Sequence, residues 1–321
     1  MQDVNKNRRI SFGGFFEAAA FVLAVFSIAT LFGGLHRYLE LFSHFKLQYL
    51  GSAVLLGIIF AITRRPRLLA LCAGLAVLNA SFVLPWYFGG DDAVDGGTSI
   101  KLMQANVLGF RDPNAELLLS QVETEKPDIL VVQEYTPAWH RALQDELAGY
   151  AYRLNEPQDG AFGIAVFSKL PLEDARIVHA PPMGHPEIRA EFELGGQRIY
   201  FASAHPMPPM GREWIEARNA QLLALGEELG RMPRPTILIG DLNTSMWAPT
   251  YRAFETASGL RNARKGHGLS PTFPVFLPIA LIPIDHVLVS DEFAVTDFRS
   301  GRRTGSDHLP IVVTLVLKPG R

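Results

Sequence analysis

Hydrophobic residues are concentrated in the first ninety positions of this 321-residue chain. Three runs there contain no charged side chain: Ala18 to Leu35, Leu47 to Thr63 and Leu68 to Gly90. A helix that crosses a bilayer needs about 20 mostly apolar residues. The first and third runs therefore predict membrane spans, and the second is of marginal length. The alternatives are buried helices of a globular core, which seldom occur three in succession, and a cleaved signal peptide, which would explain only the first run.

Basic residues flank these runs at two places. Three precede the first run and three fill the link between the second and the third: Lys6, Arg8, Arg9, Arg64, Arg65 and Arg67. Because basic loops tend to stay in the cytoplasm, we expect residues 1–90 to form a multi-pass segment of the cell (inner) membrane, with the following domain outside the cytoplasm. This orientation requires an odd number of spans, so loss of the second span would reverse it.

The pattern changes after a short segment rich in glycine and aspartate, residues 91–98, which we expect to be a linker. In residues 99–321 short apolar runs alternate with amphipathic stretches, which indicates one layered α/β or α+β domain. Eight runs predict strands: Ile100–Val107, Asp128–Gln133, Phe162–Ser168, Ile188–Leu194, Arg198–Ala204, Thr236–Ile239, Ile284–Ser290 and Ile311–Leu317. Three stretches predict helices: Asn114–Glu125, Pro137–Ala148 and Arg212–Leu229.

Charge and cysteine content narrow the function classes. Residues 99–321 carry 22 basic and 26 acidic side chains. A protein that binds duplex nucleic acid usually presents a basic stripe, and none is evident along the sequence, although scattered basic residues could still converge in space. The single cysteine, Cys72, lies in an apolar run. A disulfide framework and a cysteine metal site are therefore excluded.

Polar side chains that can bind a metal or move protons stand at the ends of the predicted strands. They are Asn106, Glu134, His205, Asp241, Asn243, Asp285, Asp307 and His308. Loops at strand ends assemble sites on a rigid scaffold, and oxygen ligands suit magnesium, manganese or calcium better than zinc. Each residue alone could equally be a turn former or a helix cap. Chance placement of all of them in this order is improbable.

Seven short motifs contain these residues. They are Gln-Ala-Asn-Val at 104–107, Val-Gln-Glu at 132–134, Gly-Ile-Ala-Val-Phe-Ser-Lys at 163–169, Ser-Ala-His-Pro at 203–206, Gly-Asp-Leu-Asn-Thr at 240–244, Ile-Asp-His-Val at 284–287 and Ser-Asp-His-Leu-Pro at 306–310. Together they resemble the endonuclease/exonuclease/phosphatase family, in particular its deoxyribonuclease I and sphingomyelinase branch. The resemblance implies a four-layer sandwich of two mixed β-sheets flanked by helices, with the site at one end.

The resemblance also implies roles by matching position. Glu134 would be the principal metal ligand, with Asn106 and Asp307 close to the ion. The ion would be Mg²⁺, or Mn²⁺ or Ca²⁺. Asp241 would orient or deprotonate the attacking water, and Asn243 would hold the scissile phosphate.

Two histidines and one arginine complete the implied site. His308, steadied by Asp285, would protonate or stabilise charge at the phosphoryl group, and His205 occupies the position of a second histidine in the deoxyribonuclease and sphingomyelinase branches. Which histidine is the general acid stays open. Arg189 is a further candidate for substrate binding because guanidinium groups fork onto phosphate oxygens; the alternative is a solvated strand residue.

The sequence therefore predicts a membrane-anchored, divalent-metal-dependent phosphodiesterase that hydrolyses a phosphate ester by metal- and histidine-assisted attack of water. The substrate would be a lipid headgroup, a small phosphoester or a nucleic acid, with a slight preference for the first two. The alternatives are an extracytoplasmic nuclease that acts on DNA or RNA, a catalytically inactive membrane-bound binding scaffold, and a polytopic membrane protein whose loops mimic the motifs. Besides the lipid bilayer, no protein partner is predicted.

Overall fold

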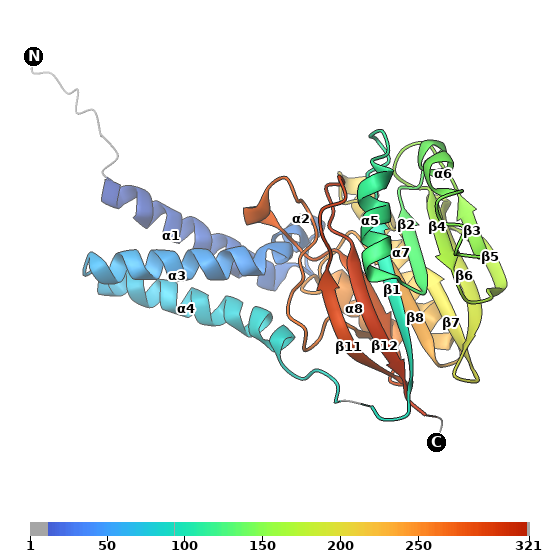
Figure 1. The fold of residues 1–321 in the computed structure, drawn as a ribbon. Helices are drawn as coiled ribbons and strands as arrows, with labels where there is room; N and C mark the ends of the chain where they lie inside the picture. Colours follow the sequence, from blue (N-terminus) through green and yellow to red (C-terminus); the bar gives the residue numbers. More distant parts are fainter. Residues whose placement is uncertain (1–11, 93, 320–321) are drawn as a thin grey trace, which may run out of the picture. The chain divides into compact units, whose positions relative to one another are not determined.

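The computed structural model describes residues 12–92 and 94–319, and the chain divides into two compact units, Met1–Leu84 and Pro85–Arg321. The basic residues Lys6, Arg8 and Arg9, which bear on the expected membrane orientation, lie outside the described residues. Figure 1 shows a helical unit followed by a unit that contains all the strands.

The first unit consists of helices. They are α1 (Phe12–Ala29), η1 (Thr30–Phe32), α2 (Arg37–Leu41), η2 (Phe42–Phe45), α3 (Lys46–Ile62) and α4 (Pro66–Val83), after which η3 (Leu84–Tyr87) leads into the second unit. Three segments are long and apolar enough to cross a membrane: Gly13–Phe32, Arg37–Ile62 and Pro66–Tyr87. The second segment reaches 26 residues because α2 and η2 extend the short apolar run of α3 toward its N-terminus.

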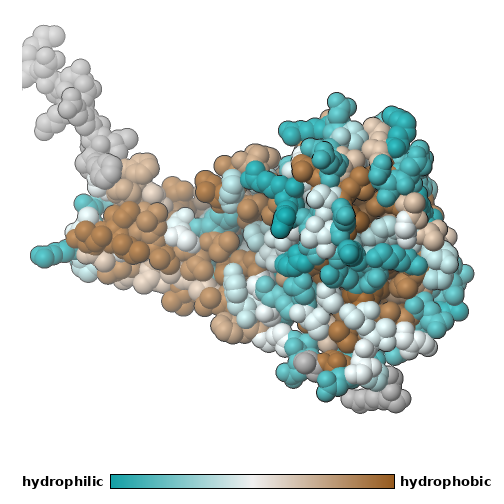
Figure 2. Space-filling view, in the orientation of Figure 1, coloured by the Kyte–Doolittle hydropathy of each residue, from teal (hydrophilic) through white to brown (hydrophobic). Residues whose placement is uncertain are grey.

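The helices of the first unit carry apolar residues on both their inner and their outer faces. The inner side chains pack into a core of Ala20, Leu23, Tyr49, Ala53, Leu56, Phe60, Cys72 and Leu75. Several large outward side chains are more than half exposed: Phe21, Val25, Leu55, Ile58, Ile62 and Val77. The brown surface over these helices in Figure 2 shows the same distribution. A helical bundle in water usually carries polar residues at such positions.

The second unit contains two six-stranded sheets (Figure 1). In order across the first sheet lie β11 (Phe293–Ser300), β12 (Ile311–Leu317), β1 (Thr98–Asn106), β2 (Ile129–Gln133), β4 (Ile164–Ser168) and β3 (Tyr152–Glu156). In order across the second lie β5 (Glu173–Ala180), β6 (His185–Leu194), β7 (Gln197–Ser203), β8 (Thr236–Asp241), β10 (Asp285–Val289) and β9 (Arg261–Asn262). The pairs β1–β2 and β7–β8 are parallel and the others antiparallel, so both sheets are mixed.

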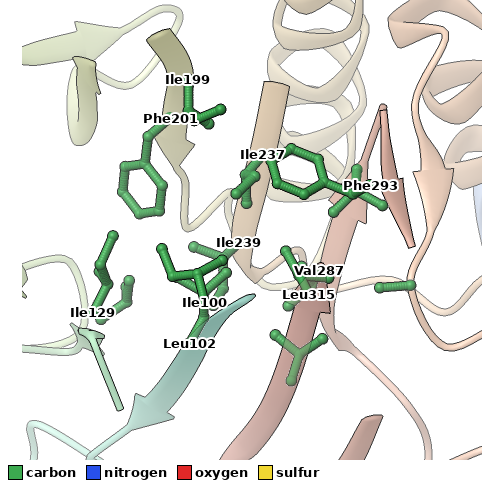
Figure 3. Packing of buried hydrophobic residues seen from close by; sticks show 14 of the residues in the cluster. Ile100, Leu102, Ile129, Ile199, Phe201, Ile237, Ile239, Val287, Phe293 and Leu315 are labelled. Atoms are coloured by element: carbon green, nitrogen blue, oxygen red, sulfur yellow. The ribbon is translucent and has the colours of Figure 1, made fainter. Parts of the chain in front are cut away.

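Apolar side chains from the two sheets meet in one core. Figure 3 shows Ile100, Ile129 and Leu315 of the first sheet beside Phe201 and Ile239 of the second. This core forms because alternate residues of each strand point to the same face.

Helices cover the outer face of each sheet, which completes four layers. Helices α5 (Ala115–Glu125) and α6 (Pro137–Leu143) pack on the first sheet through Leu118 and Trp139. On the second sheet, Glu228 of α7 (Arg212–Arg231) contacts Tyr200 of β7, and Tyr251 of α8 (Pro249–Ser258) stacks near His286 of β10. The predicted sandwich of two mixed sheets flanked by helices is confirmed.

The eight expected strands and three expected helices are present with shifted ends. The four strands that the sequence pattern missed, β3, β5, β9 and β11, are the four edge strands. Helix α8 was also missed. Helix α6 ends at Leu143 and not at Ala148, because the following turns offer the carbonyls of Gln144 and Leu147 to the Arg153 guanidinium.

The segment before β1 packs on the second unit. The Trp86 carbonyl accepts hydrogen bonds from the backbone amides of Gly266 and Gly268, at 3.0 and 2.9 Å. The Asp91 carboxylate accepts bonds from Arg261 and from the Val295 amide, each at 2.8 Å. The expected linker, residues 91–98, is held at its start by the Asp91 contacts.

Two buried glutamines join the sheets just behind the strand ends. Gln133 Oε1 accepts hydrogen bonds from Gln104 Nε2 at 2.7 Å and from the Asp241 amide at 2.8 Å, and Gln133 Nε2 donates to the Ala204 carbonyl at 2.8 Å. The backbone approaches so closely here that a Cβ on Gly240 would lie 2.0 Å from the Ala204 carbonyl oxygen. This network fixes the ends of β2, β7 and β8 relative to one another.

Replacing Gln133 by leucine should destabilise the second unit. The change leaves the buried Asp241 amide and the Ala204 carbonyl without partners, and each such group costs about 1–3 kcal/mol. We expect the free energy of unfolding to fall by about 3 kcal/mol, measured by urea unfolding in detergent with tryptophan fluorescence. Gln197→Leu, at a partly exposed hairpin position, is the matched control and should change it by about 0.5 kcal/mol or less. Equal effects of the two substitutions would contradict this assignment.

Candidate active site

The polar side chains at the strand ends lie together at one edge of the sandwich. The parallel pairs β1–β2 and β7–β8 bring their C-terminal ends to this edge, and the antiparallel β10 and β12 begin there. The loops enclose a pocket of about 250 Å³. Six residues that the sequence predicts for the site line it: Glu134, His205, Asp241, Asn243, Asp307 and His308. Asn106 and Asp285 are hydrogen-bonded to lining residues.

Glu134 and Asp241 are linked through Asn106. Asn106 Nδ2 donates to Glu134 Oε1 at 3.0 Å and to Asp241 Oδ2 at 3.2 Å. The other Glu134 oxygen accepts from the Gly109 amide at 2.7 Å, and Asn106 Oδ1 accepts from the Leu108 amide at 3.1 Å. The amide nitrogen of Asn106 thus faces both carboxylates, and ligation of a cation by Asn106 requires its amide group to turn over.

Three non-glycine residues at the pocket have left-handed backbone conformations. The φ angles are 57° at Leu108, 60° at Glu134 and 51° at Asn243. Asparagine tolerates this region, whereas leucine and glutamate adopt it at a cost of about 1–3 kcal/mol. At Asn243 the conformation is held by three bonds: its amide donates to Asp241 Oδ1, its side chain donates to the Pro206 carbonyl, and its carbonyl accepts from Arg218.

His308 is oriented by Asp285. His308 Nδ1 lies 2.9 Å from Asp285 Oδ2, and the other Asp285 oxygen accepts from Gln104 Nε2 at 2.8 Å. Burial alone would lower the pKa of His308, but the carboxylates of Asp285 and Asp241 raise it to about 10. The ring of Phe273 lies 4.8 Å from the His308 ring. The imidazolium is therefore held with Nε2 directed at the pocket.

His205 has the opposite electrostatic environment. Its Nε2 lies 3.6 Å from Asp241 Oδ2, and His308 Nε2 lies 3.7 Å from the same oxygen. Burial lowers the pKa of His205, against the raising effect of the Glu134 charge. One imidazole is thus charged and the other neutral near pH 7. Such a separation of two neighbouring groups is typical of sites that move protons.

The donor set fits a hard divalent cation. Glu134, Asp241 and Asp307 line the pocket with oxygen atoms, which Mg²⁺, Mn²⁺ and Ca²⁺ prefer. Burial and the nearby Asp285 charge raise the pKa of Asp241, against the lowering effect of the His308 charge. A bound cation would add positive charge beside this carboxylate. Ligand atoms of Asp241, Asp285 and His308 also lie within 4.8 Å of one another, but a cation held there would have to break the Asp285–His308 hydrogen bond.

Arg189 does not reach the pocket. Its guanidinium is buried between Glu187, at 2.6 Å, and Glu228 of α7, at 2.8 Å. The strand turns this side chain toward the helix that covers the sheet, and no local sequence pattern marks Glu228 as its partner. Arg189 therefore binds protein carboxylates and is removed from the substrate-binding set.

The apolar part of the pocket is not predicted from the sequence. Its lining includes Leu108, Phe110, Phe162, Pro208, Met210, Trp214, Phe273 and Ile284. The Phe162 ring contacts two histidine rings. It stacks on His185 with 3.6 Å between ring centroids, and it is tilted against His205 with 5.9 Å between centroids. Apart from Trp214, in the first turn of α7, these residues come from loops, where no periodicity marks them. The buried Gln104 and Gln133 were a readable signal, since glutamine is rare inside apolar strands.

Solved structures of the same fold have low sequence identity to this chain. D. rerio TDP2 complexed with a single-strand DNA product is 18% identical, with a TM-score of 0.59 over 68% of this chain and 98% of that chain. An endonuclease/exonuclease/phosphatase family protein from Bacteroides thetaiotaomicron is 23% identical, with a TM-score of 0.55 over 70% and 99%. The human Nocturnin catalytic domain with bound sulfate is 20% identical, with a TM-score of 0.55 over 71% and 97%.

No curated protein sequence matches the chain. The family model described as the Endonuclease/Exonuclease/phosphatase family matches residues 103–308. This match covers more than half of the chain and includes every residue that lines the pocket. The chain therefore belongs to the endonuclease/exonuclease/phosphatase family of metal-dependent phosphoric ester hydrolases.

Proposed function

We propose that this chain is a membrane-anchored, divalent-metal-dependent phosphodiesterase. The observation that carries the proposal is the convergence of Glu134, Asp241, Asn243, Asp307 and His308 in a single pocket. These side chains come from three separate regions of the sequence, and an inactive scaffold would have no need to keep oxygen ligands and an oriented imidazole together.

The metal would be held by Glu134 and Asp307, with Asn106 turned to present its oxygen. A bound Mg²⁺, Mn²⁺ or Ca²⁺ would neutralise charge on the phosphate as it is attacked. Glu134 is suited to this task because the Gly109 amide and the left-handed backbone fix its carboxylate at the pocket wall.

The remaining residues would act on water and phosphate. Asp241 would orient or deprotonate the attacking water. Asn243 would direct its side-chain amide at a phosphate oxygen after release from the Pro206 carbonyl. His308, held by Asp285, would stabilise charge on the phosphoryl group or protonate the leaving oxygen, and the neutral His205 would complete the pocket opposite Asp241.

Membrane anchoring is supported by the three apolar helical segments. Arg64 and Arg65, in the link between α3 and α4, and Arg67, in the first turn of α4, favour a cytoplasmic position for that end of the helices. With three spans, the phosphodiesterase unit would lie outside the cytoplasm, at the cell (inner) membrane.

The pocket lining favours a substrate with an apolar part. Aromatic and aliphatic side chains surround the polar floor, which suits a lipid or a small phosphoester. A nuclease activity is the second candidate, because D. rerio TDP2, of the same fold, is seen with a single-strand DNA product. A screen of phospholipids against single- and double-stranded DNA and RNA with the purified full chain discriminates between them.

Metal dependence is the first test of the proposal. Full-length protein in detergent should hydrolyse bis(p-nitrophenyl) phosphate, lose this activity in EDTA and regain it with Mg²⁺, Mn²⁺ or Ca²⁺. Glu134→Gln should lower kcat/KM about 100-fold or more, since a charge contact to the reacting centre is lost. The exposed Glu116→Gln, on α5, is the matched control and should behave as wild type. Activity that survives both chelation and Glu134→Gln would contradict the assignment.

Substitutions at the proton-transfer residues should lower kcat with little change in KM. We expect Asp241→Ala and His308→Ala to lose about 100-fold or more. Asp285→Asn should also lower kcat, and because it removes the charge that raises the pKa of His308, the alkaline loss of activity should move to lower pH. Rates measured across pH 5 to 10 check both effects. Asp297→Asn, an exposed carboxylate on β11, is the control, and an unshifted profile in Asp285→Asn would speak against the pairing.

The membrane orientation can be tested with single cysteines in a Cys72→Ser background. Glu173→Cys, on the exposed edge strand β5, should react with a membrane-impermeant maleimide in intact spheroplasts. Arg67→Cys, in the first turn of α4, should react only after lysis. The reverse labelling would place the phosphodiesterase unit in the cytoplasm.

A further inference from the structure

A loop beside the pocket exposes apolar side chains. The segment Phe273–Pro283, here called the apolar loop, contains eleven residues and no charge. Its ends are closed by a bridge between Phe273 and Ile282, and it contains only the short turn η4 (Pro278–Ala280). At its tip Phe276 is 73% exposed, Leu277 45% and Ile279 80%.

Such a tip is unusual in water. Isolated exposed apolar residues are common on protein surfaces, whereas a group of three within four positions indicates a surface that meets another apolar body. Surface loops are normally polar, because their backbone and side chains face solvent. Exposure of the tip of the apolar loop to water is therefore energetically unfavourable.

The base of the apolar loop is attached to the catalytic residues. The Val275 amide donates to the Asp307 carbonyl at 2.8 Å, and Phe273 contacts the ring of His308. Both Phe273 and the residue just after the loop, Ile284, line the pocket. Whatever holds the tip consequently also fixes the direction in which the pocket faces.

Two further exposed apolar residues belong to the pocket itself. Phe110 is 75% exposed and Met210 is 66% exposed, and both line the pocket. Together with the apolar loop, these two residues form an apolar rim around the carboxylates and histidines at the bottom of the pocket. This distribution matches an amphiphile, whose charged group would meet the floor while its apolar part remains near the rim.

Two observations identify a bilayer as the body that the loop meets. The Trp86 carbonyl, at the end of the third apolar segment Pro66–Tyr87, is bonded to Gly266 and Gly268, a few residues before the loop. At the loop's base the exposed Arg303 donates to the Val275 carbonyl at 2.9 Å, and an arginine beneath an apolar tip suits the headgroup layer of an anionic leaflet.

We infer that the apolar loop inserts its tip into the bilayer that anchors the chain and presents the pocket to the phosphodiester of a lipid in that leaflet. The lipid substrate rests on the proposed phosphodiesterase function, whereas insertion of the tip does not. In the reaction the oxygen of water bonds to phosphorus, one phosphorus–oxygen ester bond breaks, and a proton from the water ends on the alcohol that leaves, so that a phosphomonoester remains.

Insertion can be measured without any activity. The full chain with Cys72→Ser and Ile279→Cys is labelled with an environment-sensitive fluorophore and reconstituted in phosphatidylethanolamine/phosphatidylglycerol vesicles. Lipids with a spin label on the acyl chain should quench this fluorophore. A label at Leu223→Cys, on α7 and 50% exposed, is the matched control and should not be quenched. Absence of quenching at Ile279, or cross-linking of this position to a second copy or another protein in place of quenching, overturns the inference.

The substrate is tested by separating soluble from membrane substrates. In Phe276→Ser/Ile279→Ser the hydrolysis of bis(p-nitrophenyl) phosphate should stay within about twofold of wild type, while the hydrolysis of vesicle phosphatidylglycerol or phosphatidylethanolamine should fall about tenfold or more, because each buried apolar side chain accounts for about one factor of ten. Leu223→Ser should change neither rate. An equal fall on both substrates, or no fall on lipid, overturns the lipid assignment. If wild type hydrolyses neither substrate, the proposed function fails, and the quenching experiment alone decides insertion.

Discussion

Two carboxylates lie directly opposite each other at the edge of the sandwich that forms the pocket. Asp241 ends β8 and Asp285 begins β10, and the two residues are partners in the antiparallel register. Opposed carboxylates destabilise a sheet, the more so when buried. The His308 imidazole, 2.9 Å from Asp285 and 3.7 Å from Asp241, supplies the compensating charge. The attraction between the imidazolium and the two carboxylates consequently holds the three motifs together even without substrate.

The central strands and most of the site could be predicted from the sequence, for a shared reason. A strand buried on both faces must be apolar along its length, so a carboxylate or amide at its end is conspicuous, as at Asn106, Glu134 and Asp241. The edge strands lack that signature. In β5, Glu173, Asp174 and Arg176 face solvent, and the run does not stand out from a loop.

Other features depend on contacts between distant residues and could not be deduced from local pattern. Arg189 has the residue type of a phosphate ligand, yet Glu228, 39 positions later, binds its guanidinium. The orientation of the Asn106 amide likewise depends on a contact, because its oxygen accepts a hydrogen bond from the Leu108 backbone and its nitrogen therefore faces Glu134. Most of the apolar rim belongs to loops that lie far apart in the sequence, and Phe110 and Phe273 are separated by 163 positions.

The absent side chain of Gly240 has a consequence for the spacing of the catalytic groups. Because its backbone approaches the Ala204 carbonyl more closely than any Cβ permits, the residues that follow each position, Asp241 and His205, are drawn together from adjacent strands. Gly240, the smallest residue in the Gly-Asp-Leu-Asn-Thr motif, thus sets the distance between the two catalytic side chains. Any larger residue there would widen the gap between imidazole and carboxylate while leaving every reactive atom in the chain unchanged.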